Sequence, residues 1–187
     1  MKVLPTRLPD VRLIKPDVYE DRRGLFMEIF HEERYRGAGI AVPMVQINLS
    51  HSVQGTLRGL HYQLRRPQGK LIQVVRGAVF DVTVDVRRGS PTFGRWVGVN
   101  LSEENRSQLY IPEGFAHGFC VISDTADVIY GCTALYDPGD EGGILWCDPD
   151  VGIDWPVSEP ILSPKDSQLP CLADLFRERL PRYEGPA

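Results

Sequence analysis

The sequence predicts an all-β protein built as a sandwich or barrel, with a few short peripheral helices. Short segments with the residue pattern of strands recur along most of the chain, and turn signals rich in Gly, Pro, Asn and Asp separate them. Helical periodicity is scarce, and we find no internal repeat. A chain of 187 residues is long enough for one substantial hydrophobic core, so we expect a single domain over residues 1–187.

The clearest strand is predicted at residues 79–86. There Phe80, Val82 and Val84 alternate with Asp81 and Thr83, the period-two pattern of a strand with one buried face. In chain order, the other expected strands are residues 44–50, 56–63, 70–76, 94–101, 106–111, 115–122, 126–136 and 143–147. Short helices are expected at residues 31–37 and 172–180. Residues 148–170 are rich in Pro, Asp and Ser, so we expect a long loop that wraps the sandwich.

The composition is that of an ordinary globular protein. Its hydrophobic residues amount to 42% and its charged residues to 25%. No apolar run is long enough to cross a bilayer, and the N-terminus lacks the apolar centre of a signal peptide, so we expect no membrane partner and a cytoplasmic location. A pI of about 5.6 argues against a general nucleic-acid binder. The four cysteines have neither CxxC nor metal-finger spacing, which predicts buried free thiols.

Charge is distributed unevenly between residues 34 and 80. This stretch contains no Asp or Glu, although the whole chain has 25 of them and a net charge of −4. Its basic residues are Arg34, Arg36, Arg58, Arg65, Arg66, Lys70 and Arg76. A region kept free of acids in an acidic protein predicts an anionic ligand. The alternative interpretation is a solvated loop, which we favour for Arg65 and Arg66.

Two residues of this stretch are candidates for a site. For His61 alone, a core histidine bonded to the backbone is slightly favoured over a catalytic base. Arg58 has apolar and glycine neighbours, and a guanidinium in that setting needs an anion such as a phosphate. Strict alternation would place Arg58 and His61 on opposite faces of a strand. A shared site therefore requires a bulge at Gly59, or a strand end.

Two phenols are candidates on the segment 126–136. Tyr130 and Tyr136 share parity with Val128 and Cys132, so one face of the predicted strand is small and apolar and carries both phenols. Ordinary aromatic packing would be the better interpretation of either tyrosine alone. A buried phenol needs a hydrogen-bond partner, and near a cation its pKa would fall, which would let it protonate a carbanion.

Residues 112–117 form the pattern PxGxxH, which resembles the second motif of the cupins, a jelly-roll family. In metal-binding cupins this histidine is a ligand, and the first motif supplies HxH. Here the corresponding segment is His61-Tyr62-Gln63. A neutral amide is a poor replacement for imidazole on a transition metal. We therefore expect a cupin-like barrel without a metal.

Together these features resemble the dTDP-sugar epimerase family, over residues from about 21 to about 170. The resemblance is carried by residues 21–24 with Phe26 and Glu28, by 46–48, 55–70, 90–94 and 111–119, by Tyr130 and Tyr136, and by 141–142 and 162–166. It implies a jelly roll that forms a homodimer and uses no cofactor. It also implies epimerisation at C3 and C5 of a thymidine-diphospho-4-keto-6-deoxy-hexose, in dTDP-L-rhamnose biosynthesis.

The resemblance also implies roles for individual residues. His61 would be the general base, Asp166 would orient it, Tyr130 would donate a proton on the opposite face, and Lys70 would lie near the C4 oxygen of the sugar. The positions that match ligand contacts are Arg23, Glu28, Gln46, Asn48, Arg58, His117, Tyr136, Glu141 and Lys165. The chemistry is consistent, because the C4 ketone acidifies the protons on C3 and C5, and a fixed cation would stabilise the resulting enolate.

Three alternatives remain at this point. An epimerase that inverts only C3 or only C5 would use the same residues. A metal-dependent cupin oxidoreductase would bind a transition metal, and the HxQ segment speaks against it. A sugar-nucleotide binding module without catalysis would keep the arginines but would not need His61, Tyr130 and Asp166 together.

Overall fold

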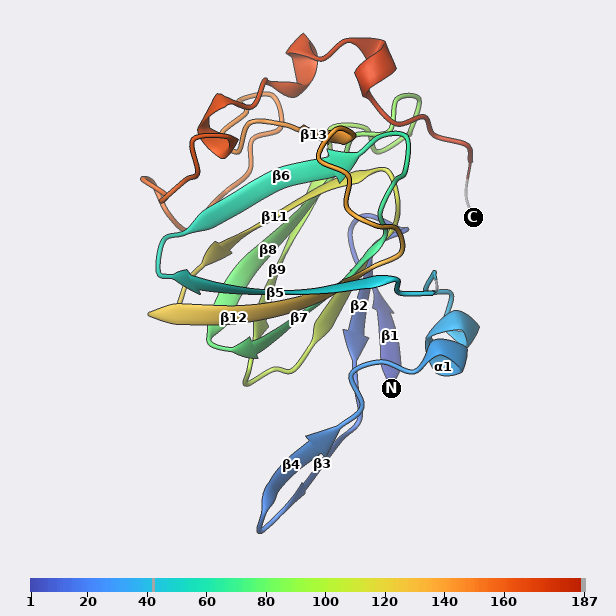
Figure 1. Cartoon of the computed structure of the whole chain (residues 1–187), viewed down its shortest axis with the longest axis vertical. Coiled ribbons are helices and arrows are strands. Elements are labelled where there is room, and N and C mark those ends of the chain that lie inside the picture. Colours follow the sequence, from blue (N-terminus) through green and yellow to red (C-terminus); the bar gives the residue numbers. More distant parts are fainter. Residues whose placement is uncertain (42, 186–187) are drawn as a thin grey trace.

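Two antiparallel sheets face each other and carry most of the ordered chain (Figure 1). The computed structural model describes residues 1–41 and 43–185. The six-stranded sheet has the order β1-β2-β10-β7-β12-β5, and the five-stranded sheet has the order β13-β6-β11-β8-β9. A separate hairpin, β3-β4, projects from the body (Figure 1). This architecture confirms the predicted all-β, cupin-like sandwich.

The strands of the six-stranded sheet are β1 (Lys2–Pro5), β2 (Arg12–Lys15), β10 (Gln108–Ile111), β7 (Lys70–Arg76), β12 (Thr125–Cys132) and β5 (Gln46–Val53). Those of the five-stranded sheet are β13 (Glu141–Gly143), β6 (Leu57–Gln63), β11 (Phe115–Val121), β8 (Ala78–Asp85) and β9 (Trp96–Ser102). The hairpin consists of β3 (Val18–Asp21) and β4 (Gly24–Met27), and one short helix, α1 (Glu32–Gly37), follows it. Within residues 1–41 and 43–185, no helix has the length and apolarity to span a membrane.

Each strand predicted between residues 44 and 147 has a counterpart among β5 to β13, and the helix predicted at 31–37 is α1. β12 is shorter than predicted because its partners β7 and β5 begin at Lys70 and Gln46, both opposite Cys132, and the residues beyond are held largely by side chains instead of a strand. The segment 143–147 meets β13 only at Gly143, because Leu145 already donates to the carbonyl of Pro170 in the C-terminal segment. The four N-terminal strands were not predicted, since each has only four residues.

The segment 172–180 is wrong as a single helix. It forms two 3₁₀ turns, η2 (Leu172–Asp174) and η3 (Arg177–Arg179), and a third, η1 (Asp166–Gln168), precedes them. The predicted loop 148–170 does wrap the sandwich, over the outer face of the five-stranded sheet (Figure 1). There Val151, Leu172 and Leu180 pack on Val82 and Val84 of β8.

The cover over β8 overturns the prediction of a half-buried strand. Asp81, Thr83 and Asp85 are as inaccessible to solvent as the valines between them. Their side lies between the two sheets, whereas the valines face the C-terminal segment. Alternation of apolar and polar residues therefore identifies the strand correctly, but it does not show whether the polar face is exposed to solvent.

The space between the sheets changes character along the strands. On β7 and β12, Ile72, Val74 and Val128 belong to the main hydrophobic cluster. Toward the start of β7 and the end of β12 the same faces carry Lys70 and Cys132, which lie opposite each other. One end of the sandwich is thus filled with aliphatic side chains, and the other end is polar.

A β-bulge in β6 determines what reaches that polar end. From Arg58 to His61 the strand takes three steps where β11 takes two. The extra residue lets Arg58 and His61 share one side, and the predicted bulge at Gly59 is confirmed. Gly59 has a φ of 120°, and a Cβ there would lie 2.6 Å from the Cα of Gly118.

Replacement of Gly59 by alanine should therefore be costly. Gly59→Ala forces a side chain into the left-handed region, at about 1–2 kcal/mol, and drives it into β11, which adds about 1–3 kcal/mol. The matched control is Gly55→Ala, where φ is 78° but no atom lies within 4 Å of the new Cβ. Urea unfolding of both variants should show the larger loss of stability at position 59. Equal losses would contradict a steric role for the bulge.

Candidate active site

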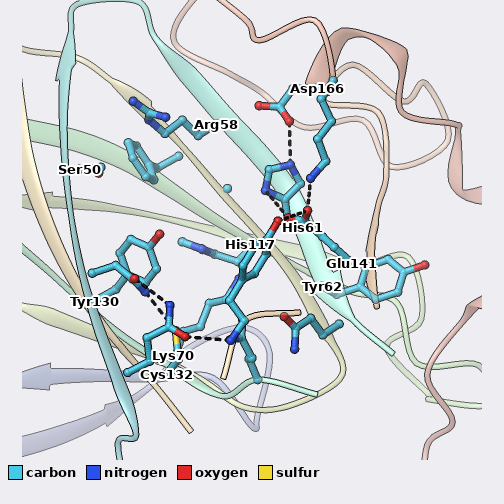
Figure 2. Close-up of a pocket in the computed structure, with 18 of the residues that line it drawn as sticks. Ser50, Arg58, His61, Tyr62, Lys70, His117, Tyr130, Cys132, Glu141 and Asp166 are labelled. Atoms are coloured by element: carbon cyan, nitrogen blue, oxygen red, sulfur yellow. Dashed lines mark hydrogen bonds and ion pairs between the residues drawn. The ribbon is translucent and has the colours of Figure 1, made fainter. Parts of the chain in front are cut away.

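A cavity of about 400 Å³ lies at the polar end of the sandwich, with walls from both sheets (Figure 2). It collects most of the residues selected from the sequence. These are His61, Lys70, Tyr130 and Asp166, together with Gln46, Asn48, Arg58, His117, Tyr136, Glu141 and Lys165. Arg23 and Glu28 do not line it.

His61 is the best-defined side chain of one wall. It projects from β6, and its Nε2 lies 2.7 Å from Oδ1 of Asp166 (Figure 2). Asp166 begins η1 in the C-terminal segment, and its carboxylate also accepts a bond of 3.4 Å from the amide of Gly59. With Nε2 committed to Asp166, the Nδ1 atom is the nitrogen of His61 that is left to react.

Burial alone would raise the pKa of Asp166, but the hydrogen bond and charge of His61 outweigh it and hold the pKa of this carboxyl below its usual value. The amide of Gly59 adds to the lowering. Asp166 is therefore an anion at neutral pH and can hold the imidazole ring in one orientation.

Tyr130 and Lys70 lie on the opposite wall. Both face inward from the six-stranded sheet, Tyr130 on β12 and Lys70 at the start of β7. His61 belongs to the five-stranded sheet. A ligand in the cavity would therefore have an imidazole on one side and a phenol with an ammonium on the other.

Lys70 is a partly buried cation without a carboxylate partner among the described residues. Burial lowers its pKa, and Cys132 and Asp81 offset this only in part. An ammonium held out of water without a counter-ion is poised to stabilise negative charge that develops on a ligand.

The pKa of Tyr130 moves opposite to the prediction. Burial raises it, Cys132 raises it further, and Arg58 lowers it by less. The phenol is thus held protonated rather than acidified. It can still donate a proton to a strongly basic carbon, which needs no pre-acidified donor.

Arg58 supplies the other unpaired cation of the cavity. Its Nε donates to Ser52 Oγ at 3.1 Å, and within the described chain no carboxylate lies in ion-pair range of it. Ser50 also lines the cavity, and its buried hydroxyl has no hydrogen-bond partner among the described residues. No sequence motif identifies Ser50. A phosphate would satisfy both groups.

The other arginines of the acid-free stretch do not line the cavity, and four of them are paired. Acids from elsewhere neutralise these arginines, in the pairs Arg34–Glu28, Arg36–Glu32, Arg65–Asp140 and Arg66–Asp137. The inference of a continuous positive region for a ligand is therefore wrong. It applies to Arg58 and Lys70 only.

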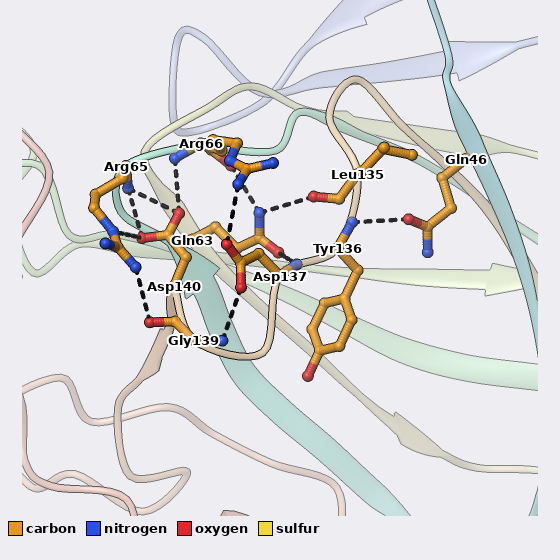
Figure 3. Close-up of polar contacts among 9 residues, drawn as sticks. All are labelled: Gln46, Gln63, Arg65, Arg66, Leu135, Tyr136, Asp137, Gly139 and Asp140. Carbon is orange, nitrogen blue, oxygen red and sulfur yellow. Dashed lines mark hydrogen bonds and ion pairs between the residues drawn. The ribbon is translucent and has the colours of Figure 1, made fainter.

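Arg65 and Arg66 are exposed loop residues, as predicted, and they also form contacts that the sequence did not indicate. Their backbone amides donate to the buried carboxylate of Asp140, and their side chains pair with Asp140 and Asp137 (Figure 3). Gln63 completes the network, since its amide nitrogen donates to the carbonyl of Leu135 and its oxygen accepts from the amide of Asp137. These contacts hold the loop that carries Tyr136 toward the cavity.

Gln63, the third residue of the HxQ segment, thus stabilises the structure. Gln63 uses both ends of its amide on the neighbouring loop (Figure 3). His117 is held by Asp81, whose two oxygens lie 2.9 and 3.0 Å from its Nε2. Sequence reasoning missed Asp81 because its alternation suggested a solvent-facing residue. No three His, Cys, Asp or Glu side chains of residues 1–41 and 43–185 are grouped as a metal would need.

Glu141 joins several elements at the rim of the cavity. It begins β13 and accepts from the hydroxyl of Tyr136 at 2.9 Å, and it forms an ion pair with Lys165. Its Oε1 lies 3.6 Å from Nδ1 of His61. Tyr136 itself lies beyond the end of β12, not on the strand as predicted.

The four cysteines are free thiols, but the prediction that all are buried is wrong. Cys120 and Cys132 are buried, Cys171 is partly exposed and Cys147 is exposed. Cys132 lines the cavity and accepts from the side chain of Asn48 at 3.7 Å.

Comparisons with known proteins match this chain to one family. The family model described as dTDP-4-dehydrorhamnose 3,5-epimerase matches residues 5–174. A Shigella flexneri protein of that name is 55% identical over 168 residues, which are 89% of this chain and 93% of that protein. A Neisseria gonorrhoeae protein of the same name is 54% identical over 167 residues. They cover 89% of this chain but only 51% of that longer protein.

A solved structure is similar over nearly the whole chain. It is the dTDP-6-deoxy-D-glucose-3,5-epimerase of Legionella pneumophila in complex with dTDP-4-keto-L-rhamnose, with a TM-score of 0.96 and 49% identity. The match covers 98% of this chain and 99% of that one.

The lowered pKa of Asp166 predicts a pH-dependent contribution to stability. Its bonds favour the charged form, so the contribution is present above the unfolded pKa of about 3.9 and disappears as pH falls through the folded value. Asp166→Asn should reduce the free energy of unfolding by about 1–3 kcal/mol at pH 6 and by less at pH 3, measured by urea titration. In a His61→Asn background the effect at pH 6 should shrink. A loss that is independent of pH would contradict the charge-assisted bond.

Proposed function

The chain belongs to the dTDP-4-dehydrorhamnose 3,5-epimerase family, and from this premise we propose that it converts dTDP-4-dehydro-6-deoxy-D-glucose to dTDP-4-dehydro-L-rhamnose. The reaction inverts C3 and C5 and is a step of dTDP-L-rhamnose biosynthesis. One observation carries the proposal. A histidine oriented by a carboxylate and a partly buried phenol lie on opposite walls of one cavity. Inversion requires that arrangement, because the proton leaves one face of the carbon and returns to the other.

The first step is proton removal next to the ketone. C3 and C5 both flank C4, so loss of either proton gives an enolate with its charge on the C4 oxygen. We assign proton removal to Nδ1 of His61 in its neutral form, since Nε2 is held by Asp166. The Asp166 anion then stabilises the imidazolium that forms.

Lys70 is our candidate for the stabiliser of the enolate. Its side chain is partly buried, lines the cavity and has no carboxylate partner in the described chain. A preorganised cation of this kind costs no solvent reorganisation when charge develops on the substrate oxygen. Removal of one such group typically costs about 10²–10³-fold in rate.

Tyr130 would return a proton from the opposite wall. Its raised pKa keeps the phenol protonated until the basic enolate carbon is in place. The phenolate left behind then regains a proton from solvent. No step calls for a metal or a redox cofactor, and no observation favours the oxidoreductase alternative.

The diphosphate is assigned to Arg58 and its neighbours. Arg58 lines the cavity and has no carboxylate partner among the described residues, and on the facing sheet the hydroxyl of Ser50 has no hydrogen-bond partner among them. Gln46 and Asn48 present amides from the same strand, β5. These groups would neutralise and position the nucleotide while the sugar extends toward His61.

We further propose that the protein acts as a homodimer. Large apolar side chains are exposed on and beside β5 and on the β3-β4 hairpin: Val45, Ile47, Leu49 and Val53, with Tyr19, Leu25 and Phe26. A patch of this kind on a sheet edge and a projecting hairpin needs cover. Arg23 and Glu28 match ligand-contact positions yet lie on or next to this hairpin, outside their own cavity. They would complete the cavity of a second copy.

Deuterium labelling tests the reaction. With the 4-keto sugar nucleotide in D₂O, NMR should show label entering both C3 and C5, because the returned proton comes from solvent. Label at one carbon only would favour a single-centre epimerase, and label at neither would refute the proposal. His61→Asn should lower exchange by about 10²–10⁴-fold while nucleotide binding is largely kept. Exchange at the wild-type rate in that variant would overturn the assignment of the base.

A substitution in the exposed apolar patch on β5 tests the proposed dimer. Ile47 is 71% exposed in the single chain. Ile47→Asp should raise the dimer dissociation constant by about 10–100-fold, because the aspartate would be buried as a charge in the dimer interface. Sedimentation velocity measures this. Phe176→Asp is the matched control, since Phe176 is 77% exposed on the C-terminal segment, away from β5. A wild-type chain that stays monomeric at micromolar concentration would contradict the proposal.

A further inference from the structure

His61 lies between two carboxylates rather than one. Asp166 holds Nε2 at 2.7 Å, and Oε1 of Glu141 lies 3.6 Å from Nδ1, the nitrogen left for chemistry (Figure 2). The side chain of Asp166 is 6% exposed and that of Glu141 is 10% exposed. A second acid so close to the reactive nitrogen has no part in removal of the substrate proton, so it calls for a separate explanation.

The surroundings of Glu141 leave one of its oxygens for His61. The hydroxyl of Tyr136 and the ammonium of Lys165 both contact Oε2. Oε1 is the oxygen directed at the imidazole. The strand register supports this, because Glu141 pairs with Gln63 and is a diagonal neighbour of His61 across β6 and β13.

The proposed reaction creates a need for such a group. Each inversion leaves one proton on His61, so the same base cannot act at the second carbon until it has lost that proton. Asp166 cannot provide the exit, since it is buried and bonded to the other nitrogen. The proton on Nδ1 must leave by the side of the ring that faces Glu141.

We propose that Glu141 accepts the proton from Nδ1 of His61 and passes it to solvent at the rim, which resets the base between inversions. This inference rests on the proposed function. The proton from carbon moves to Nδ1 and then to Oε1, and water takes it from there. Neutral His61 and anionic Glu141 are regenerated, with no net change of charge. Lys165, with its side chain 53% exposed, connects Glu141 to the solvent-facing side.

The test separates the first inversion from the second. Glu141→Gln keeps the shape of the side chain but removes its ability to take a proton. In a single turnover with enzyme in excess, rapid quench and NMR of the sugar resolve the singly and doubly inverted products. The rate of the second inversion relative to the first should fall by about 10–100-fold compared with wild type, at the lower end of general acid–base effects. Singly inverted sugar should accumulate.

Chemical rescue distinguishes a proton acceptor from a structural residue. Added formate or imidazole should accelerate the second inversion in Glu141→Gln and leave wild type unchanged, whereas a packing defect would not respond. Glu141→Asp keeps a carboxylate and should recover part of the rate. If Glu141→Gln does not fold, Tyr136→Phe removes one contact to Oε2 and should show the same delay to a smaller degree.

The outcomes are distinct. Equal slowing of both inversions, or no slowing of the second, would overturn the role of Glu141 while the epimerase proposal stands. Failure of the wild type to invert either centre would refute the proposed function itself. If the wild type inverts one centre only, Glu141→Gln should show a fast first turnover per site and slow later ones. Absence of that burst would again overturn the role.

Discussion

The hydrogen bond between His61 and Asp166 joins residues 105 positions apart and makes the cavity a site. Without it the imidazole has no fixed tautomer, and its reactive nitrogen has no direction. The bond exists only because the C-terminal segment packs its apolar side chains on the outer face of the five-stranded sheet. The chemistry of the inner face therefore depends on hydrophobic contacts on the other side of the same sheet.

The two sheets divide the remaining work. β6 brings the imidazole and β13 one carboxylate, η1 adds the second carboxylate beside them, and β7 and β12 bring a cation and a phenol. The pairing register within each sheet sets the spacing on each wall, and the packed aliphatic end of the sandwich sets the distance between the walls. The bulge at Gly59 is the one departure from regular pairing that the site requires, because it turns Arg58 toward the cavity beside His61. A rigid sandwich is well suited to hold opposed groups apart without letting them meet.

The sequence predicted the fold, the strands from residue 44 onward and the bulge, because alternation and glycine carry direct geometric meaning. It failed where the answer depended on distant segments. Asp81 was read as solvent-facing because nothing local shows that a second sheet covers it. The exposure of Arg65 and Arg66 was predictable, but their contacts with Asp140 were not, because that partner lies more than 70 residues away. The sequence motifs predicted that His61 and Asp166 act together. They did not predict that Glu141 lies on the other side of the His61 imidazole, because that depends on the fold.

Lys165 and Asp166 are neighbours in sequence. Lys165 pairs with Glu141, and Asp166 bonds to His61. During synthesis both sheets can assemble before this pair leaves the ribosome, yet the base has no orientation until it arrives. We therefore expect the nascent sandwich to be inactive until the C-terminal segment has packed onto it. The same arrangement makes the long loop before residue 163 a natural place to divide the chain into two fragments. Activity would then report directly on whether the fragments have reassociated.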